Sequence, residues 1–576
     1  MGISIRGGSG SVTLSAIMAQ RKAKRHRAVR GFDFSLWRIF LTNKAASAVA
    51  VGMLFSTVGQ IHAGIVNAAS PLLGDVTVAV LAAIDGDTVV LPAGTAKWTS
   101  ALIVNKAITL QGAGIGQTII LDSLPSNAPS PQSLLVFNTP ANKNVRLTGF
   151  EFQADPNGRT TSFGQGVVQL SGSSNQVRVD HCKFVNVRNR SLYISGSVFG
   201  VVDHCDIENG NIQQGPIYVY HDGILGPNGE AGSFGDGSWA TPSNLGSANA
   251  MYFEDNTFNC PSTQFNPAIT DANAGARFVV RHNTIHNHNL QAHGSGSTGR
   301  SRSARVCEIY ENTMDYTPSI SAQAVFMRGG TGVIFNNTVT GASPNSTFYF
   351  ENYRANEKLS VWNGSNGMSS WDKNDTTDYT GNGLGGGPNG LWASGTAGSG
   401  STGQTLVITG ANFRTNQWRG FAVVNLDQPY VLSGVNFPNT FATVQSNTAN
   451  TITVALAPHS AAVQVWVPGN HYEIRKVASS LDTIGAGPGD YLGGGANPTP
   501  RLLNQTNEPY YIWNNTLNGS AVAGSGGGEI NSGWFVNFVN ATKPGYTPYV
   551  YPHPLVSGAS ASATPSAPQN LRVTGP

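Results

Sequence analysis

The chain has 576 residues, of which only 11% are charged and 69 are glycine, and its formal net charge is +3. Much of that charge lies in the basic stretch Arg21–Arg30, so the sequence gives no support to a nucleic-acid partner. Few charges together with many Gly, Asn, Thr and Ser residues agree with an all-β chain that turns often.

The first 68 residues have the features of an export signal. The basic stretch precedes an apolar run, Ala45–Gly59, that is too short to span a bilayer. Ala63 and Ala68 offer cleavage positions, and a start at Met18 would shorten the long basic region. We predict a secreted or cell-surface protein with no membrane contact after signal removal. An uncleaved membrane anchor is the alternative.

Seven strand-like runs between Val177 and Leu517 end in a similar four-residue signature, whose first residue serves below as the marker. Steps between the first six markers are 23, 51, 27, 29 and 25 residues. The markers are His181, His204, Asp255, His282, Glu311, Asn336 and Asn514. A period in the twenties with a strand in each unit is typical of a solenoid, whose units must stack to bury their apolar faces.

Residue types around the marker predict how each unit is built. Apolar residues recur two before and three after it, as expected for inward positions of two strands that flank a bend. An asparagine follows the marker in five copies: Asn256, Asn283, Asn312, Asn337 and Asn515. Each can bond to the same asparagine one coil away and satisfy the buried backbone of the bend. Leucine-rich and helical repeat patterns are not visible.

Residues one before the marker face outward in this arrangement. Up the stack they are three acids and then an arginine: Asp180, Asp203, Glu254 and Arg281. Three carboxylates beside a guanidinium can hold a hard cation in oxygen ligands. Arg178, Tyr252 and Tyr310 lie on the same predicted face, and the tyrosines offer an aromatic surface for a sugar ring. The alternative is a salt-bridge ladder that contributes little energy.

The marker column itself is rich in histidine, with His181, His204 and His282. Histidine is a common transition-metal ligand, but turn residues that bond the backbone are commoner than metal sites. The sequence therefore favours a turn role for these side chains.

A second candidate cluster lies in His286–Asn312. It combines general-base candidates, including His293, with Glu308 and three anion-binding guanidiniums: Arg300, Arg302 and Arg305. A flexible basic loop is the alternative. The preceding segment Gly210–Ala248 is 39 residues long and predicts a loop that could serve as a lid.

Cys182 and Cys205 replace the turn asparagine in coils 23 residues apart. Strands in adjacent coils lie about 4.8 Å apart, near the lower end of disulfide Cα separations. We predict a disulfide between them, with two stacked reduced thiols as an equally supported alternative.

The repeat pattern lapses between the sixth and seventh markers. Alternating runs with Asn and Gly turns predict a small antiparallel β module over 393–478. The coils resume over 481–555, and a Ser/Ala/Pro-rich tail occupies 556–576.

The repeats resemble the right-handed parallel β-helix of pectate lyases and of many bacterial and phage proteins that act on polysaccharides. The likeness covers roughly 76–392 and 481–555, and Ile84–Gly114 resembles the first coils of such proteins. The fold implied is all-β, a right-handed parallel β-helix (β-solenoid) with an inserted antiparallel module. Fold alone does not fix activity.

The resemblance also implies a site on the exterior sheet. In pectate lyases acids there bind calcium, and an Arg or Lys removes the proton at C5 of a uronate. This implies Arg281 as proton acceptor and Asp180, Asp203 and Glu254 as calcium ligands. The alternative site places the chemistry on His293, Arg305 and Glu308. Arg178, Tyr252, Tyr310, Arg300 and Arg302 are the candidate substrate-binding residues, although no pectate lyase motif matches residue by residue.

The expected function is action on an extracellular, acidic polysaccharide, with a lyase that works by β-elimination as the leading hypothesis. A non-catalytic, adhesin-like carbohydrate-binding protein is the first alternative. A glycoside hydrolase is the second, and it needs paired carboxylates at a suitable separation. Calcium is the one cofactor expected, and the sequence does not indicate an oligomeric state.

Overall fold

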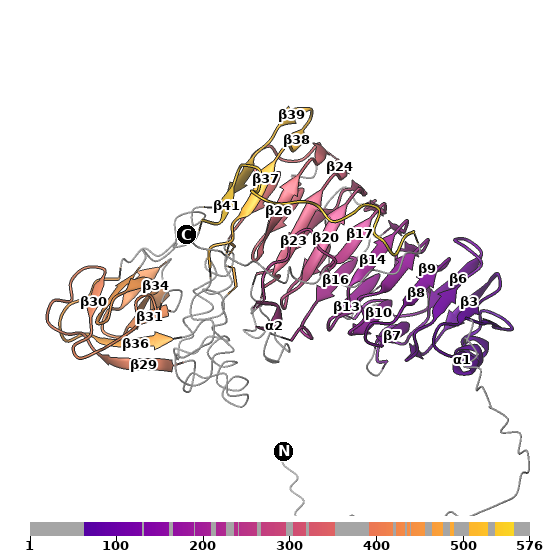
Figure 1. Ribbon diagram of the computed structural model, residues 1–576, viewed down its shortest axis with the longest axis horizontal. Coiled ribbons are helices and arrows are strands. Elements are labelled where there is room, and N and C mark those ends of the chain that lie inside the picture. Colours follow the sequence, from indigo (N-terminus) through magenta and orange to yellow (C-terminus); the bar gives the residue numbers. More distant parts are fainter. Residues whose placement is uncertain are drawn as a thin grey trace, which may run out of the picture. The chain divides into compact units, whose positions relative to one another are not determined.

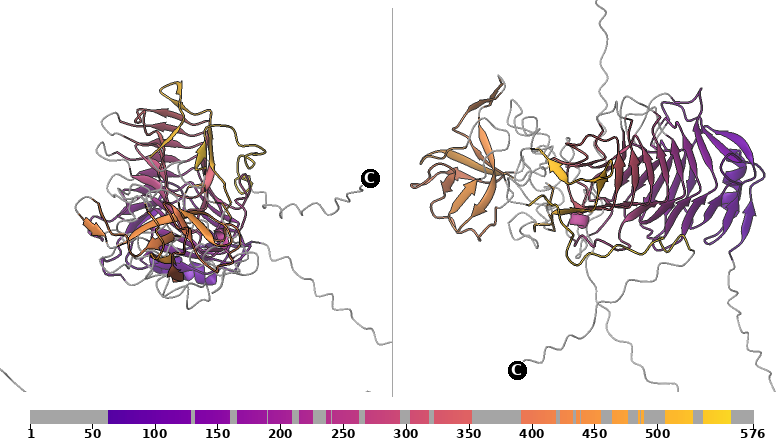
Figure 2. Two further views of the ribbon diagram at one scale, coloured as in Figure 1. Left: turned by 90° about the vertical axis from the view of Figure 1, so that its left-hand side faces the viewer. Right: turned by 90° about the horizontal axis from the view of Figure 1, so that it is seen from above.

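The chain forms a right-handed parallel β-helix, which confirms the predicted fold class (Figure 1). The computed structural model describes residues 63–557 apart from 129–131, 160–164, 189, 209–214, 226–235, 240, 262–266, 295–302, 318–321, 352–390, 419–421, 433–434, 438, 455–463, 476–483, 486, 489–505 and 528–535. Its coils contribute strands to three long sheets, here sheets A, B and C, and Figure 2 shows the coils stacked one behind another.

Sheet A has twelve strands, and it carries the marker repeats. In spatial order they are β1 (Ile65–Asn67), β2 (Thr88–Val90), β5 (Thr109–Gln111), β8 (Val145–Thr148), β11 (Val177–Asp180), β14 (Gly200–Asp203), β17 (Met251–Glu254), β20 (Arg277–Arg281), β23 (Val306–Tyr310), β26 (Thr331–Phe335), β37 (Tyr510–Trp513) and β41 (Phe538–Val539).

Sheet B follows the bend after each marker and has eleven strands. They are β3 (Gly94–Trp98), β6 (Thr118–Asp122), β9 (Glu151–Ala154), β12 (Lys183–Val185), β15 (Asp206–Glu208), β18 (Thr257–Asn259), β21 (Thr284–His286), β24 (Thr313–Asp315), β27 (Thr338–Thr340), β38 (Thr516–Leu517) and β39 (Ser520–Ala521).

Sheet C closes each coil and has ten strands. They are β4 (Leu102–Val104), β7 (Leu135–Thr139), β10 (Val168–Gly172), β13 (Leu192–Ser195), β16 (Ile217–Tyr220), β19 (Ala268–Ala272), β22 (Asn289–Ala292), β25 (Val325–Met327), β28 (Phe348–Phe350) and β40 (Gly524–Gly526).

The predicted inward positions form the core of the solenoid. Val179, Val202 and Phe253 pair in register along sheet A, and all three are fully buried. Phe184, Ile207 and Phe258 do the same in sheet B and belong to the same core cluster. Stacking therefore supplies each coil with the apolar contacts that it lacks alone.

The asparagine ladder at the bend is also confirmed. Asn312 illustrates the repeating contact, since its backbone N–H and its Nδ2 donate to Asn337 Oδ1 at 3.1 and 2.9 Å. Its own Oδ1 accepts the equivalent pair from Asn283, at 3.1 and 3.0 Å. The ladder runs from Asn256 to Asn515, so Asn337 bonds to a residue 178 positions later across the insertion.

The solenoid begins earlier than residue 76. Strand β1 pairs with β2, and helix α1 (Leu73–Ala82) follows it and contributes buried Val76, Ala79 and Val80. Since β1 lies within the predicted export signal, cleavage at Ala63 would retain this strand and cleavage at Ala68 would remove it. The rest of that signal, residues 1–62, is outside the described residues. None of the helices within the described ranges has the length and apolar character to cross a membrane.

The long segment Gly210–Ala248 is not only a loop, and this corrects the sequence interpretation. It contains strand β16 of sheet C and the short helix α2 (Asp236–Trp239). The 51-residue step between markers is therefore one coil with an enlarged turn after β16.

The inserted module has its own sheet and its own core. Trp418, Trp466 and Ile474 belong to a hydrophobic cluster separate from that of the solenoid. Its six-stranded antiparallel sheet contains β29 (Leu391–Thr396), β36 (His471–Arg475), β31 (Ala422–Asn425), β34 (Thr440–Asn447), β35 (Thr451–Val454) and β30 (Thr405–Val407), and a hairpin is formed by β32 (Tyr430–Leu432) and β33 (Val435–Phe437).

The predicted disulfide is not formed, because Cys182 and Cys205 are both free and buried. Parallel side chains in adjacent coils keep the strand spacing of about 4.8 Å, whereas bonded Cβ atoms are about 3.8 Å apart. The two cysteines match the alternative of stacked thiols, and burial raises the pKa of Cys205 well above its ordinary value. Cys260 and Cys307 are buried as well.

Candidate functional site

The three acids and Arg281 line one column on the exterior of sheet A. Asp180 pairs with Asp203, Asp203 with Glu254, and Glu254 with Arg281 in the strand register. Tyr310 follows Arg281 on the next strand. The sequence thus placed these side chains correctly relative to one another, but each of the five is at most 1% exposed.

Each acid of this column is bound by a guanidinium. Asp180 accepts two hydrogen bonds of 2.7 Å from Arg146, and Asp203 accepts two of 2.9 and 2.8 Å from Arg178. Glu254 Oε2 accepts from Arg281 Nε at 2.8 Å. A calcium ion at these carboxylates would have to displace guanidinium groups, so the calcium site stays a prediction.

The chain's own C-terminal segment covers this column. Residues 546–556, here called the strap, cross the exterior of sheet A, where Figure 1 shows the yellow trace running over β26 to β14. Arg281 donates to the carbonyl oxygens of Tyr549 and Val550 at 2.7 and 2.8 Å. Arg178 donates to those of Leu555 and Val556, both at 3.2 Å. The two arginines therefore hold the strap by its backbone.

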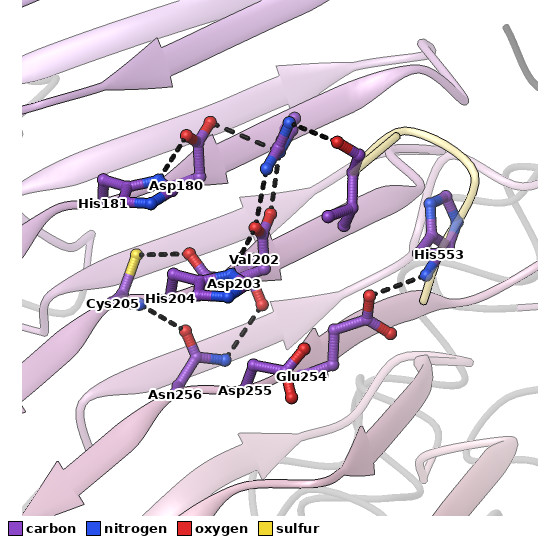
Figure 3. A network of polar contacts seen from close by, with 12 residues as sticks. Asp180, His181, Val202, Asp203, His204, Cys205, Glu254, Asp255, Asn256 and His553 are labelled. Carbon is purple, nitrogen blue, oxygen red and sulfur yellow. Dashed lines mark hydrogen bonds and ion pairs between the residues drawn. The ribbon is translucent and has the colours of Figure 1, made fainter. Parts of the chain in front are cut away.

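Acidic side chains hold the strap as well. Glu254 Oε1 accepts the backbone N–H of His553 at 2.7 Å (Figure 3). Tyr546 donates to Glu308 Oε2 at 2.6 Å, and the other oxygen of Glu308 accepts from the backbone of Gly246.

Aromatic packing completes the cover. Tyr252 lies under Tyr549 and His553, with ring centroids 5.4 and 5.0 Å away. Tyr310 and Phe335 stack at 4.6 Å and belong to an apolar cluster that includes the strap. The strap thus seals the face on which the sequence placed the substrate.

Arg281 is also poorly suited to accept a proton in this state. Burial alone would lower its pKa, but Tyr310 and Glu254 outweigh burial and raise the pKa above the ordinary value. A general base works best when its pKa lies near the operating pH. The proton-acceptor role of Arg281 therefore stays a prediction that requires displacement of the strap.

The second predicted cluster is divided by the fold. Glu308 lies on sheet A under the strap, whereas His293 directly follows strand β22 of sheet C. Arg305 is fully buried, with its NH2 group 2.9 Å from Glu508 Oε2 and its guanidinium over Trp239. Arg300 and Arg302 lie outside the described residues. The structure thus separates His293 from Glu308.

The exterior of sheet C carries an open aromatic surface, which we call the tyrosine face: Tyr193, Tyr218 and Tyr220. Tyr193 and Tyr218 are partners in adjacent strands, and their rings are 5.3 Å apart and parallel within 8°. Tyr218 and Tyr220 stack at 5.9 Å. All three rings are partly exposed, which makes this surface accessible in a way that the sealed column is not.

Charged and polar groups accompany these rings. The guanidinium carbon of Arg190 lies 4.1 Å from the centre of the Tyr218 ring. The Tyr218 hydroxyl donates to Asn273 at 2.9 Å. Burial raises the pKa of half-buried Asp222 to about 6, and burial together with Asp222 raises that of Tyr193 to about 12. A cation and an acid with a shifted pKa thus flank the aromatic rings.

The same exterior surface continues three strands further along sheet C. Arg328 lies over the ring of Phe326 at 5.2 Å, and it donates to Gln291 Oε1 at 2.9 Å. The Phe326 and Tyr349 rings are 5.9 Å apart. His293 is partly exposed at the end of β22, and its backbone N–H donates to Ala272 O in the next strand. A second aromatic and cationic group therefore lies in line with the tyrosine face.

Sequence reasoning missed the tyrosine face because it assigned 210–248 to a loop. The signal was present in Ile217, Tyr218, Val219 and Tyr220, where buried aliphatic and partly exposed aromatic residues alternate as in a half-buried strand. The marker lies at the bend between sheets A and B, so β16, like the other strands of sheet C, carries no signature of its own.

Within the ranges that the structure covers, no three or more His, Cys, Asp and Glu side chains gather closely enough to hold a metal ion. The partly exposed histidines and acids therefore do not form a closed metal site by themselves.

No family model and no curated protein matches the chain. Among solved structures it is similar to a PL6 family polysaccharide lyase from Pseudopedobacter saltans, at 14% identity over 50% of this chain and 65% of that one with a TM-score of 0.30. The chain is also similar to a mutant of the PL6 family alginate lyase AlyGC. The identity is 14%, the match covers 48% of this chain and 38% of that one, and the TM-score is 0.28. An alginate lyase from Paenibacillus sp. is 13% identical, with 48% of this chain and 96% of that one covered and a TM-score of 0.24. The chain thus spans just under two thirds of the first of these proteins.

Proposed function

We propose that this protein is exported and binds an extracellular acidic polysaccharide on the tyrosine face of sheet C. The observation that carries the proposal is the row of partly exposed, stacked rings at Tyr193, Tyr218 and Tyr220 with Arg190 beside it. An extended polymer can lie across parallel strands and meet one side chain in each coil.

The chemistry of the face suits a uronate polymer. The apolar side of a sugar ring can pack on an aromatic ring. Tyrosine suits this contact because it has a large apolar surface and a polar hydroxyl group at its tip. A guanidinium pairs with a carboxylate through charge-assisted hydrogen bonds. Arg328 is partly exposed beside Phe326, so it could engage a carboxylate of the polymer.

Binding to a panel of soluble polysaccharides tests this proposal. We expect uronate polymers to bind, neutral glucans to bind weakly, and Tyr218→Ala to weaken the uronate affinity about 5- to 10-fold, or ~1–1.4 kcal/mol. Thr284→Ala on the exposed surface of sheet B is the matched control and should bind like the wild type. Equal affinity in Tyr193→Ala, Tyr218→Ala and the wild type would reject the tyrosine face as the binding site.

A β-eliminating lyase on the same surface is the second candidate, and partly exposed His293 favours it. His293 follows the last registered pair of β19 and β22, so Asn273 and Arg328 occupy the neighbouring strand ends on either side. In this scheme His293 takes the C5 proton, Arg328 neutralises the carboxylate, and a C4=C5 double bond forms as the C4–O bond breaks. The leaving oxygen takes a proton from water, and the product is an unsaturated uronate.

Ultraviolet absorbance of the unsaturated product measures this activity. His293→Asn should abolish turnover and leave polymer binding intact, because it removes the base and not the aromatic face. If turnover survives in His293→Asn and disappears in an Arg281 variant that folds, the chemistry belongs to sheet A and the strap must move. A wild type that binds without turnover is the adhesin-like protein that the sequence allowed.

A further inference from the structure

We propose that the protein forms a two-fold symmetric dimer in which the α1 helices of two copies pack against each other. Helix α1 closes one end of the solenoid, since it packs against β1, β3 and β4, the first strands of sheets A, B and C (Figure 1). The dimer does not depend on polysaccharide binding. Its consequence for binding, two tyrosine faces on one particle, rests on the proposed function.

The outer face of α1 is apolar. Val78 and Leu81 are 67% and 71% exposed, and Gly74 and Ala82 are exposed beside them. Residues three and four positions apart are neighbours on a helix surface, so these four residues share one face. The opposite face packs into the core of the solenoid. Helix α1 therefore presents an apolar face to solvent in the single chain.

Other exposed apolar side chains lie around α1. Ile65 of β1, Ile103 of β4, Leu72 and Ile84 are between 46% and 70% exposed. Together with Val78 and Leu81 they are six of the thirteen exposed large apolar side chains among the described residues. The exposed apolar surface is thus concentrated at this end of the solenoid and not scattered singly. Clustered surface of this kind marks an interaction site.

The charges at the two ends of α1 favour a second, antiparallel copy as the partner. Asp75 lies in the first turn of the helix. At the other end, Lys106 Nζ donates to three carbonyl oxygens of residues 80–83 at 2.5–3.0 Å. Each full charge exceeds the opposite partial charge of the helix end, about half a unit. The N-terminal end is therefore negative and the C-terminal end positive, and an antiparallel pair brings unlike ends together.

The shape of the face favours the same arrangement. Gly74, Val78 and Ala82 are spaced by four residues, so a two-fold axis at Val78 places Gly74 opposite Ala82 of the second copy. With a rise of about 1.5 Å per residue, Leu81 lies about 4.5 Å along the helix from the axis, and Gly74 of the second copy about 6 Å in the same direction. A side chain built on Gly74 would meet nothing within 4 Å. Leu81 of the second copy can fill that space.

Sedimentation equilibrium of the full chain tests the dimer. We expect twice the monomer mass for the wild type at micromolar concentration. Leu81→Lys should weaken association at least about 10-fold, because the symmetry buries the new charge twice. Leu225→Lys is the matched control, since Leu225 is 62% exposed in the turn after β16, and it should associate like the wild type. Equal melting temperatures of the two variants would show that Leu81→Lys leaves the fold intact.

Disulfide cross-linking tests the symmetry. Val78→Cys should give a covalent dimer under mild oxidation, because the axis brings the two copies of this residue together, and Leu225→Cys should not. The native cysteines are buried, and denaturation in excess alkylating reagent keeps them from pairing afterwards. A monomeric wild type, unweakened association of Leu81→Lys, or no cross-link in Val78→Cys would overturn the proposal. A monomeric wild type that binds phospholipid vesicles would assign the face to a lipid surface instead.

Discussion

At the scale of single residues, the bend is the most strictly determined part of each coil. Every marker from His181 to Asn514 has a left-handed backbone, and in the five later copies the asparagine that follows takes part in a ladder of bonds between adjacent coils. The side chain thus satisfies backbone groups that the strands on either side cannot reach. A repeated polar residue inside an apolar solenoid is stable because every copy is bonded.

Asn312 offers a direct test of this ladder. Asn312→Leu leaves the backbone and side-chain donors of Asn283 without their acceptor, and we expect a loss of about 1–3 kcal/mol in the free energy of unfolding. Urea denaturation measures it, with exposed Thr313→Leu as the neighbouring control. If both variants unfold at the same urea concentration, the ladder does not contribute as described.

Asp222 should make polysaccharide binding depend on pH. Burial raises the pKa of Asp222 to about 6, so its carboxyl group is neutral below that pH and charged above it. A charged Asp222 repels a uronate carboxylate on the tyrosine face, and affinity should rise as pH falls through 6. Binding measured from pH 5 to 7.5 should show this rise in the wild type and a flat profile in Asp222→Asn. A pH-dependent Asp222→Asn would assign the effect to another group.

At the scale of elements, the charged column on sheet A serves as the binding surface for the strap. Arg281 and Arg178 donate to four carbonyl oxygens of the strap while they neutralise Glu254 and Asp203. The column thus binds one extended chain, and in this structure that chain is the protein's own C-terminal segment. Ion pairs that are exposed on a bare solenoid become buried contacts beneath the strap.

Arg281→Ala should therefore destabilise the protein as well as affect any chemistry. It leaves Glu254 buried without its cation and releases two strap carbonyls, and removal of one partner of a buried pair costs about 3–5 kcal/mol. Arg146→Ala is the control, because Arg146 is 40% exposed and Asp180 keeps Thr148 and His181 as partners. Thermal unfolding compares the two, and similar melting temperatures would show that the strap is held by other contacts.

At the scale of the whole molecule, three buried histidines couple stability to pH. Burial lowers the pKa of His221 and His553 to about 3 and that of His288 to about 4. Each is neutral when folded and takes up a proton on unfolding below its ordinary pKa of about 6.5. The unfolded chain thus binds more protons between pH 6.5 and 3, so stability is full above 6.5 and falls as pH decreases.

Each histidine contributes at most about 1.4 kcal/mol for each pH unit in this range. Urea midpoints at pH 7, 5.5 and 4 should therefore decrease stepwise. His553→Asn is the test, and His471→Asn, at a side chain that is 62% exposed, serves as the control. The slope should be shallower in His553→Asn, and an unchanged slope would contradict the burial of His553 under the strap.

The sequence by itself determined the architecture of the coils, because the repeated pattern shows which residues of adjacent coils stack on one another. Inward apolar residues, the asparagine after five of the markers and the column from Asp180 to Arg281 all follow from period and alternation, and the structure has each in register. These features depend on residues close in the chain or one repeat away. Local pattern is sufficient for them.

Only the tertiary structure decided which faces are open. The strap contacts Arg281 on sheet A from a position 268 residues later in the chain. Strand β16, which has no repeat signature of its own, pairs with β13 and brings Tyr218 and Tyr220 beside Tyr193. Side-chain alternation indicates that a residue points outward, but not whether a distant segment covers it. Accessibility depends on contacts with distant segments that lie outside the repeat pattern. The sequence therefore located the charged column but could not show that the strap covers it.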